Sequence, residues 1–166
     1  MSEHTKRAKE LFEQGYNCAQ SVFAAFSDEI GMYFETALKI SSSFGGGMGR
    51  LREVCGAVTA MFMIAGIELG YADPKDDKAK AEHYKLIQSL AFRFKELHGS
   101  FICRDLLGLD RGADDPTPEK RSNGYYHSRP CSDFVECAAE MIEEFILKKM
   151  EAKNENSSGN GREQFR

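Results

Sequence analysis

The sequence lacks several features that would assign it to a familiar functional class. It contains no tryptophan, four prolines in 166 residues and no block of lysine or arginine. Nucleic-acid-binding proteins usually carry a basic patch that releases counterions from phosphates. Because the net charge here is −4, we expect no nucleic-acid partner.

Long hydrophobic runs are also missing. The longest uncharged stretch, Val54 to Ile67, is shorter than the roughly 20 residues that cross a bilayer, and it predicts a buried helix rather than a membrane insertion. The N-terminal residues have no apolar core of the kind found in signal peptides. We therefore expect a cytoplasmic location.

Cysteine is the residue type whose presence needs an explanation. The five cysteines are Cys18, Cys55, Cys103, Cys131 and Cys137. A reducing cytoplasm keeps such thiols free, so structural disulfides are not expected. No two of them form a C-x-x-C pair, so neither a thioredoxin-type motif nor a zinc knuckle is supported. Metal binding, catalysis and simple burial as small apolar residues remain open.

The apolar periodicity predicts six or seven helices and no strands, which indicates an all-α bundle. We expect helices over about 2–15, 17–31, 35–43, 52–69, 74–98 and 103–107, and a last one from about 131 to 153. The stretch 52–69 is apolar on almost all sides and predicts a central helix. Residues 109–130 predict a loop, because they hold glycine, asparagine and proline without periodicity. Residues 1–153 predict a single domain, and the polar tail 154–166 is expected to be disordered.

Three of the cysteines fall in the first turn of a predicted helix. Cys18 follows a possible cap, Asn17, while Cys103 and Cys131 each lie three residues after a serine that is a possible cap. Free N–H groups and the positive end of the helix dipole stabilise a thiolate there and lower its pKa. Cys137 lies in mid-helix between apolar neighbours, and we expect it to serve core packing.

A glycine cluster precedes Cys55. Gly45, Gly46 and Gly47 are candidate cofactor-binding residues together with Gly56, because successive backbone N–H groups of a glycine loop donate to phosphate, thiolate or cluster sulfur. A phosphate loop is disfavoured, since no strand precedes the cluster and no Gly-Lys-Ser/Thr follows it. We favour a turn that brings Cys55 into place.

Charged and imidazole side chains near these segments carry weaker signals. Arg50 and Arg52 could hold an anion or stabilise a nearby thiolate, but as exposed surface charges they need no function. The remaining residues that we weighed are expected to be structural or solvated: His83 as a core or boundary residue, and His98, His127, Asp114, Asp115, Glu143 and Glu144 as solvated groups.

Five segments together resemble a known family. They are YNCAQS (16–21), FGGGMG (44–49), CGAVTA (55–60), CRDLLG (103–108) and RPCS (129–132). The ordered set resembles the redox-active protein family named for its cysteine pattern, C_GCAxxG_C_C, over about residues 15–145. The resemblance implies that Cys18, Cys55, Cys103 and Cys131 are the characteristic cysteines and leaves Cys137 out. One departure is Ala60, where the family motif has glycine; it puts in doubt a close backbone or cofactor approach, not the thiol.

Three functional hypotheses follow. The leading one is thiol–disulfide exchange or electron transfer, in which one thiolate attacks a disulfide and a second resolves the mixed disulfide, with Cys55 as a central member. The second is an iron–sulfur cluster or metal ion held by Cys18, Cys55, Cys103 and Cys131. The third is a non-catalytic helical partner or homo-oligomer. The sequence indicates neither a substrate nor a redox partner, and it leaves the attacking and resolving cysteines unassigned.

Overall fold

The described part of the chain is helical, as the periodicity predicts. The computed structural model describes the backbone of residues 2–110 and 112–159 and the side chains of residues 2–110 and 112–148. Within these residues no strand is present, and the only bridge between extended segments joins Val54 and Ile102. The helices are α1 (Glu3–Glu13), α2 (Cys18–Ala25), α3 (Phe34–Ser42), α4 (Gly45–Met48), α5 (Gly56–Leu69), α6 (Asp77–His98), α7 (Cys103–Leu106), α8 (Asn123–Ser128) and α9 (Cys131–Gly159). The all-α prediction is confirmed.

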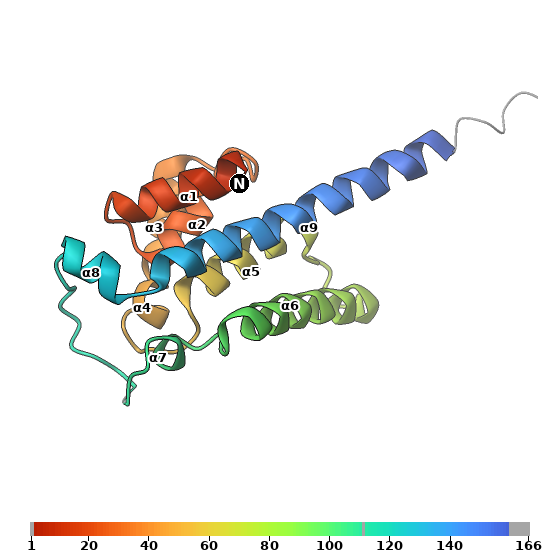
Figure 1. Ribbon diagram of the computed structural model, residues 1–166. Helices are drawn as coiled ribbons and strands as arrows, with labels where there is room; N and C mark the ends of the chain where they lie inside the picture. The colour runs from red at the N-terminus through yellow and green to blue at the C-terminus, as the bar shows by residue number, and fades with distance from the viewer. Residues whose placement is uncertain (1, 111, 160–166) are drawn as a thin grey trace, which may run out of the picture.

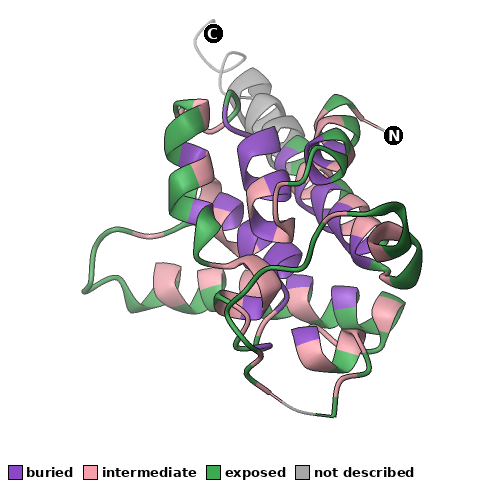
Figure 2. Cartoon of the chain, turned by 90° about the vertical axis from the view of Figure 1, so that its left-hand side faces the viewer, coloured by how far each residue is buried: buried purple, intermediate pink, exposed green. Residues whose placement is uncertain are grey.

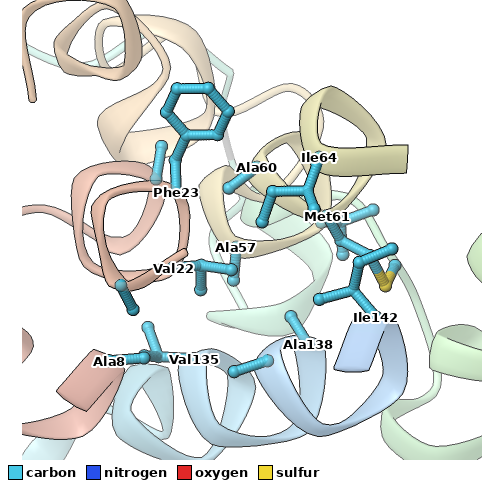
Figure 3. Close-up of a cluster of buried hydrophobic side chains, with 14 of the residues drawn as sticks. Ala8, Val22, Phe23, Ala57, Ala60, Met61, Ile64, Val135, Ala138 and Ile142 are labelled. Atoms are coloured by element: carbon cyan, nitrogen blue, oxygen red, sulfur yellow. The ribbon is translucent and has the colours of Figure 1, made fainter. Parts of the chain in front are cut away.

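Five helices form the main packing unit. Helix α2 packs against α1, α3, α5 and α9, and α9 crosses both α1 and α5 (Figure 1). Small and branched side chains such as Val22, Ala57 and Val135 meet between α2, α5 and α9 without exposed surface (Figure 3). Burial of these apolar side chains provides most of the stabilisation of such a bundle. The short helices α4, α7 and α8 gather at the end where α9 begins (Figure 1).

Buried residues gather on the helix faces that point into the molecule, and exposed residues follow the outer faces and the connecting loops (Figure 2). Helix α6 shows this clearly, because only Leu90 and Phe94 of its 22 residues are fully buried. Within the described residues, no helix is both long and apolar enough to cross a membrane.

Helix α5 begins at Gly56, four residues later than predicted. The cause is backbone conformation: Arg50 and Arg52 have φ values of 69° and 62°, in the left-handed region that an α-helix excludes. Residues 53 and 54 instead form an extended segment that pairs with residues 101–103.

Other helix boundaries also differ from the prediction. Helix α6 is capped by Asp76 rather than Asp73, because the Asp73 carboxylate accepts a hydrogen bond from the Lys75 N–H and closes a separate turn. Helix α2 ends at Ala25, and turns lead from there to Gly31, whose φ is 63°. The glycine cluster forms one irregular helical turn, α4, as the expected turn at this position requires.

The expected loop over 109–130 contains a helix. Helix α8 begins after Ser122, whose hydroxyl accepts a hydrogen bond from the Tyr125 N–H, and Tyr126 packs its ring against Phe12. Without apolar periodicity the sequence does not reveal this helix, since it rests on a cap and on contacts with α1.

Helix α9 continues to Gly159, so residues 154–159 are helical where a disordered tail was expected. Extending a helix that already exists is far easier than nucleating one. Residues 160–166 lie outside the described residues.

Candidate functional site

The four cysteines of the motif lie at four helix N-termini. Cys18, Cys103 and Cys131 are the first residues of α2, α7 and α9, and Cys55 is the N-cap of α5. All four line one small pocket of about 50 Å³, which we call the cysteine pocket. Its other lining residues are Asn17, Gly46, Gly47, Arg52, Gly56, Leu106, Leu107, Arg121, Tyr125, Arg129 and Phe134. The structure therefore brings together cysteines that are up to 113 residues apart (131 − 18) in sequence.

A short bridge between two extended segments places Cys55 next to Cys103. The Cys55 N–H donates to the Phe101 carbonyl over 2.9 Å, and the Cys103 N–H donates to the Glu53 carbonyl over 2.6 Å. These bonds surround the Val54–Ile102 bridge. The two thiols thus enter the pocket from adjacent backbone segments, although 48 positions separate them in sequence (103 − 55).

Glycines allow the other elements to approach closely. A Cβ on Gly47, whose φ is 68°, would lie 2.6 Å from the Cβ of Cys103, and a Cβ on Gly56 would lie 2.8 Å from the Phe44 carbonyl oxygen. Side chains at these positions would force the pocket walls apart. The candidate residues Gly46, Gly47 and Gly56 line the cysteine pocket, whereas Gly45 does not.

The departure from the family motif, Ala60, lies elsewhere. It is fully buried in α5 and does not line the cysteine pocket. Its methyl group therefore belongs to helix packing and leaves the wall around Cys55 unchanged.

Asn17 begins α2 as the sequence predicts. Its side chain accepts a hydrogen bond from the Gln20 N–H, and the Gln20 side chain accepts one from the Asn17 N–H, which completes a capping box. The Asn17 amide also donates to the Ser42 carbonyl. The serines proposed as caps for the other two cysteines do not serve this role: Ile102 is the N-cap of α7, and Ser128 ends α8.

Cys18 and Cys131 form a hydrogen-bonded pair whose pKa values move in opposite directions. The hydrogen bond from the Cys18 thiol lowers the pKa of Cys131, and the nearby guanidinium groups of Arg129, Arg121 and Arg52 lower it further against the effect of burial. The same hydrogen bond, together with burial, raises the pKa of Cys18 well above its usual range. The pair therefore contains one thiol suited to ionise and one that holds its proton.

The other two thiols of the pocket are harder to ionise. Burial raises the pKa of Cys55 to about 12, although the nearby backbone N–H groups of Ala57 and Val58 act in the opposite direction. Burial also raises the pKa of Cys103, against the opposing charge of Arg52. The expectation that helix N-termini make thiolates of Cys18 and Cys103 is therefore wrong. At Cys18 the hydrogen bond with Cys131, together with burial, outweighs the dipole of α2, and at Cys103 burial outweighs the dipole of α7.

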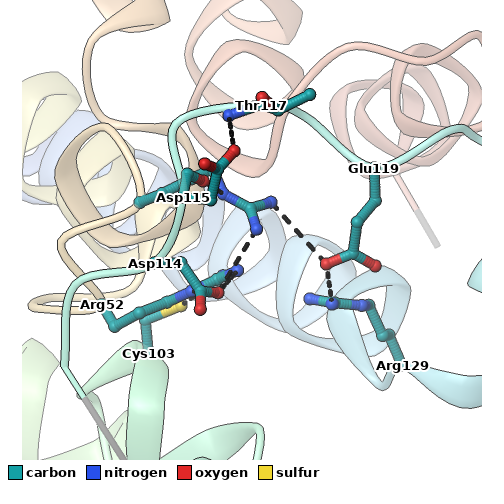
Figure 4. Close-up of polar contacts among 8 residues, drawn as sticks. Arg52, Cys103, Asp114, Asp115, Thr117, Glu119 and Arg129 are labelled. Atoms are coloured by element: carbon teal, nitrogen blue, oxygen red, sulfur yellow. Dashed lines mark hydrogen bonds and ion pairs between the residues drawn. The ribbon is translucent and has the colours of Figure 1, made fainter.

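Arg52 is a buried pocket residue rather than a surface charge. Its side chain is 3% exposed, its Nη1 lies 3.7 Å from the Cys103 sulfur, and its Nε and Nη2 donate to the Asp114 carboxylate over 2.9 and 2.6 Å (Figure 4). Asp114 also pairs with Arg50 at 3.3 Å. The prediction that Asp114 is solvated is wrong, since 14% of its side chain is exposed and it holds both arginines. Asp115 is exposed as expected.

Three residues of the cysteine pocket were not identified from the sequence, because they lie in the segment 109–130 that was predicted as a loop. They are Arg121, Tyr125 and Arg129. Arg121 lies over the rings of Phe12, Tyr125 and Tyr126, with its guanidinium 4.5 Å from the Tyr125 centroid. Arg129 also lies over the Tyr125 ring, 5.0 Å from its centroid, and pairs with Glu119. Arg129 precedes the Pro130–Cys131 pair, which is the only sequence signal that points to it.

The remaining candidate residues lie outside the cysteine pocket. Cys137 is half-buried in α9 with its sulfur 3.8 Å from that of Met141, in agreement with a packing role. His98 is not solvated, because its ring packs between those of Phe94 and Phe134 at 4.6 and 4.9 Å. Burial lowers the pKa of His98.

Two histidines and two glutamates outside the cysteine pocket were also expected to be structural or solvated. His83 is half-buried, with its ring edge-on to that of Tyr71 at 6.0 Å, as a boundary residue should be, and His127 is exposed. Glu144 forms ion pairs at the surface with Arg93 and Lys148. Glu143 is less solvated than predicted, since its carboxylate lies 3.0 Å from His4 and 16% of its side chain is exposed.

Among the described residues, no group of three or more histidine, cysteine, aspartate or glutamate side chains is arranged to hold a metal ion. The four cysteines nevertheless line one pocket, and a metal or iron–sulfur site on them stays a hypothesis.

The comparison with known proteins agrees with the cysteine geometry. Neither a curated protein nor a solved structure matches the chain. A family model described as "Putative redox-active protein (C_GCAxxG_C_C)" matches residues 16–145, a span that includes every lining residue of the cysteine pocket. This description supports a redox-related function at the level of the family. Since the match covers most of the sequence and all of the pocket, the chain belongs to the C_GCAxxG_C_C family.

Proposed function

We propose that this protein is a thiol–disulfide redox protein of the cytoplasm in which Cys131 attacks and Cys18 resolves. The observation that carries the proposal is that these two thiols line the same pocket and interact there, with opposite shifts of their pKa values. The thiolate is the nucleophile in disulfide exchange, and a second thiol within reach completes the reaction.

The reaction proceeds in two exchanges. The Cys131 thiolate attacks a disulfide R–S–S–R, a bond forms between Cys131 and one sulfur, and RS⁻ leaves. Cys18 then loses its proton to the departing thiolate, attacks the Cys131 sulfur and releases the second RS⁻, which takes a proton from solvent. The two protein thiols are oxidised by two electrons to a disulfide, and the substrate disulfide is reduced to two thiols.

The arginines and the other two cysteines support this assignment. Positive charge from Arg129, Arg121 and Arg52 stabilises the Cys131 thiolate. Cys55, with a pKa of about 12, remains a thiol at neutral pH, and so does Cys103 with its raised pKa. We therefore assign the attack to Cys131 rather than to Cys55, and we place Cys55 in the pocket wall.

The test is a redox titration of the full chain against oxidised and reduced dithiothreitol. We expect one reversible two-electron couple, with loss of two of the five thiols and a peptide map that links Cys18 to Cys131. Cys131→Ser and Cys18→Ser should each abolish the couple. Cys137→Ser is the matched control, since this thiol lies outside the pocket, and it should leave the midpoint unchanged. Absence of a reversible couple, or a link that uses neither Cys18 nor Cys131, would overturn the proposal.

A further inference from the structure

A second, larger pocket opens beside the cysteine pocket. Its volume is about 260 Å³, and we call it the arginine pocket. Its lining includes Arg50 and Glu119. Six further lining residues also line the cysteine pocket: Asn17, Gly46, Arg52, Arg121, Tyr125 and Arg129. The two pockets therefore adjoin, and these six residues line both of them.

The charge of the arginine pocket is opposite to that of the whole protein. Its lining residues include four arginines, with Glu119 as the acidic residue, whereas the chain as a whole carries a net charge of −4. Arg50 and Arg52 share the Asp114 carboxylate. Arg129 is paired with Glu119, which also lies 3.7 Å from Arg50. Four guanidinium groups thus face two carboxylates, and positive charge is in excess.

Arg121 carries the uncompensated charge. Among the described residues, no carboxylate lies within ion-pair distance of its guanidinium, whose hydrogen bond runs from Nη2 to the Tyr16 carbonyl. Its Nη1 is buried without a hydrogen-bond partner. Buried donors of a charged group are rarely left unpaired, since the cost is large. An arginine that is stacked over aromatic rings, has an unpaired Nη1 and lines two pockets is suited to bind a carboxylate.

We infer that the substrate is a low-molecular-weight disulfide that carries carboxylate groups, with a carboxylate bound by Arg121 in the arginine pocket and the reacting sulfur in the cysteine pocket. This inference rests on the proposed function. The sizes agree with it: about 50 Å³ admits one end of a molecule, and about 260 Å³ beside it admits the rest. A water molecule needs at least about 10–15 Å³ on this scale, so the cysteine pocket has room for a small group such as one end of a disulfide reagent.

The reaction consists of the same two thiol–disulfide exchanges as the proposed function. The Cys131 thiolate displaces one carboxylate-bearing thiolate and forms a mixed disulfide, which leaves the other half of the substrate near Arg121. Cys18 then displaces this second half. Two carboxylate-bearing thiols leave, and the protein retains the Cys18–Cys131 disulfide.

The test compares three symmetric aliphatic disulfides of similar size with the reduced full-length protein: 3,3′-dithiodipropionate (anionic), 2-hydroxyethyl disulfide (neutral) and cystamine (cationic). Each rate constant is divided by that of free 2-mercaptoethanol with the same disulfide, which removes the intrinsic reactivity of the reagent. We expect a normalised preference for the anionic over the cationic disulfide of about 10-fold or more at low salt, decreasing as salt screens the charges.

Two variants with opposite expected effects sharpen the test. Arg121→Gln should lower the anionic-to-cationic ratio to near one, and Arg121→Lys should retain part of it. Glu119→Gln removes the acidic residue of the lining and should raise the ratio, which a merely structural disturbance would not do. Arg93→Gln is the matched control, because it removes one positive charge at a surface ion pair with Glu144 far from the pocket. The ratio is insensitive to changes in the Cys131 thiolate fraction, since these affect all three reagents equally.

The outcomes separate the two proposals. A protein that reacts with all three disulfides at equal normalised rates keeps the proposed function and overturns this inference. A protein that reacts with none of them overturns the proposed function. If Arg121→Gln does not fold, the wild-type ratio, its salt dependence and Glu119→Gln decide the question.

Discussion

At the residue scale, the Cys18–Cys131 hydrogen bond controls which thiol ionises. The Cys18 thiol and three guanidinium groups lower the pKa of Cys131, and we expect Cys131 to be alkylated at a lower pH than the other cysteines. Cys18→Ala removes the donor, so the midpoint of the pH profile for alkylation of Cys131 should move to higher pH. Iodoacetamide labelling, followed by mass spectrometry of the Cys131 peptide, measures this midpoint.

The control for this prediction is Cys137→Ser, which removes a thiol of raised pKa that does not touch the pocket. It should leave the Cys131 profile unchanged. An unchanged midpoint in Cys18→Ala would show that the hydrogen bond does not determine the acidity of Cys131.

At the scale of the element, the contact between α4 and α7 depends on a glycine. Gly47 has a φ of 68°, and a Cβ there would lie 2.6 Å from the Cβ of Cys103 and 2.9 Å from the Glu53 nitrogen. We therefore expect Gly47→Ala to lower the free energy of unfolding by about 2–4 kcal/mol, from left-handed strain and overpacking together. Urea denaturation in the presence of reductant measures this loss.

Gly112→Ala is the matched control for the same substitution, because its Cβ would meet nothing within 4 Å. It should change the free energy of unfolding by less than about 0.5 kcal/mol. Equal effects of the two substitutions would refute the close contact between α4 and α7.

At the scale of the whole molecule, the buried thiols tie stability to pH. The pKa of Cys55 is about 12 in the folded protein, whereas an unfolded chain has a cysteine pKa of about 8.5. The folded state therefore holds the proton more tightly, and the contribution is present below pH 8.5 and lost as the pH rises toward 12. For Cys55 alone, the free energy of unfolding should fall by about 2 kcal/mol between pH 8 and pH 10. Denaturation curves under reducing conditions at both pH values measure the fall.

Cys55→Ala should reduce this pH dependence by the same amount. Val58→Ala is the control, since Val58 is fully buried in the same helix and does not titrate. It should lower the free energy of unfolding equally at both pH values. A wild-type slope retained in Cys55→Ala would mean that this thiol ionises in the folded state as readily as in the unfolded one.

The local features of the fold could be predicted from the sequence because they depend on neighbouring residues. Helical periodicity, the Asn17 cap and the helix starts at Cys18, Cys103 and Cys131 all involve residues within a few positions of one another. The start of α5 could not be predicted, because the conformation of residues 50–54 depends on contacts with a segment about 50 positions later. Helix α8 could not be predicted for the same reason, since Tyr126 packs on Phe12 of α1.

The sequence by itself determined the helical class, the four motif cysteines and the exclusion of Cys137, since these follow from periodicity and from the ordered pattern of segments. Tertiary structure decided that the four thiols share one pocket and that Cys131 is the acidic one. It also decided that Arg52 is buried on Asp114 and that Arg121 faces a second pocket. The physical reason is that desolvation and charge–charge interactions depend on distances in space, and these are unrelated to separation along the chain.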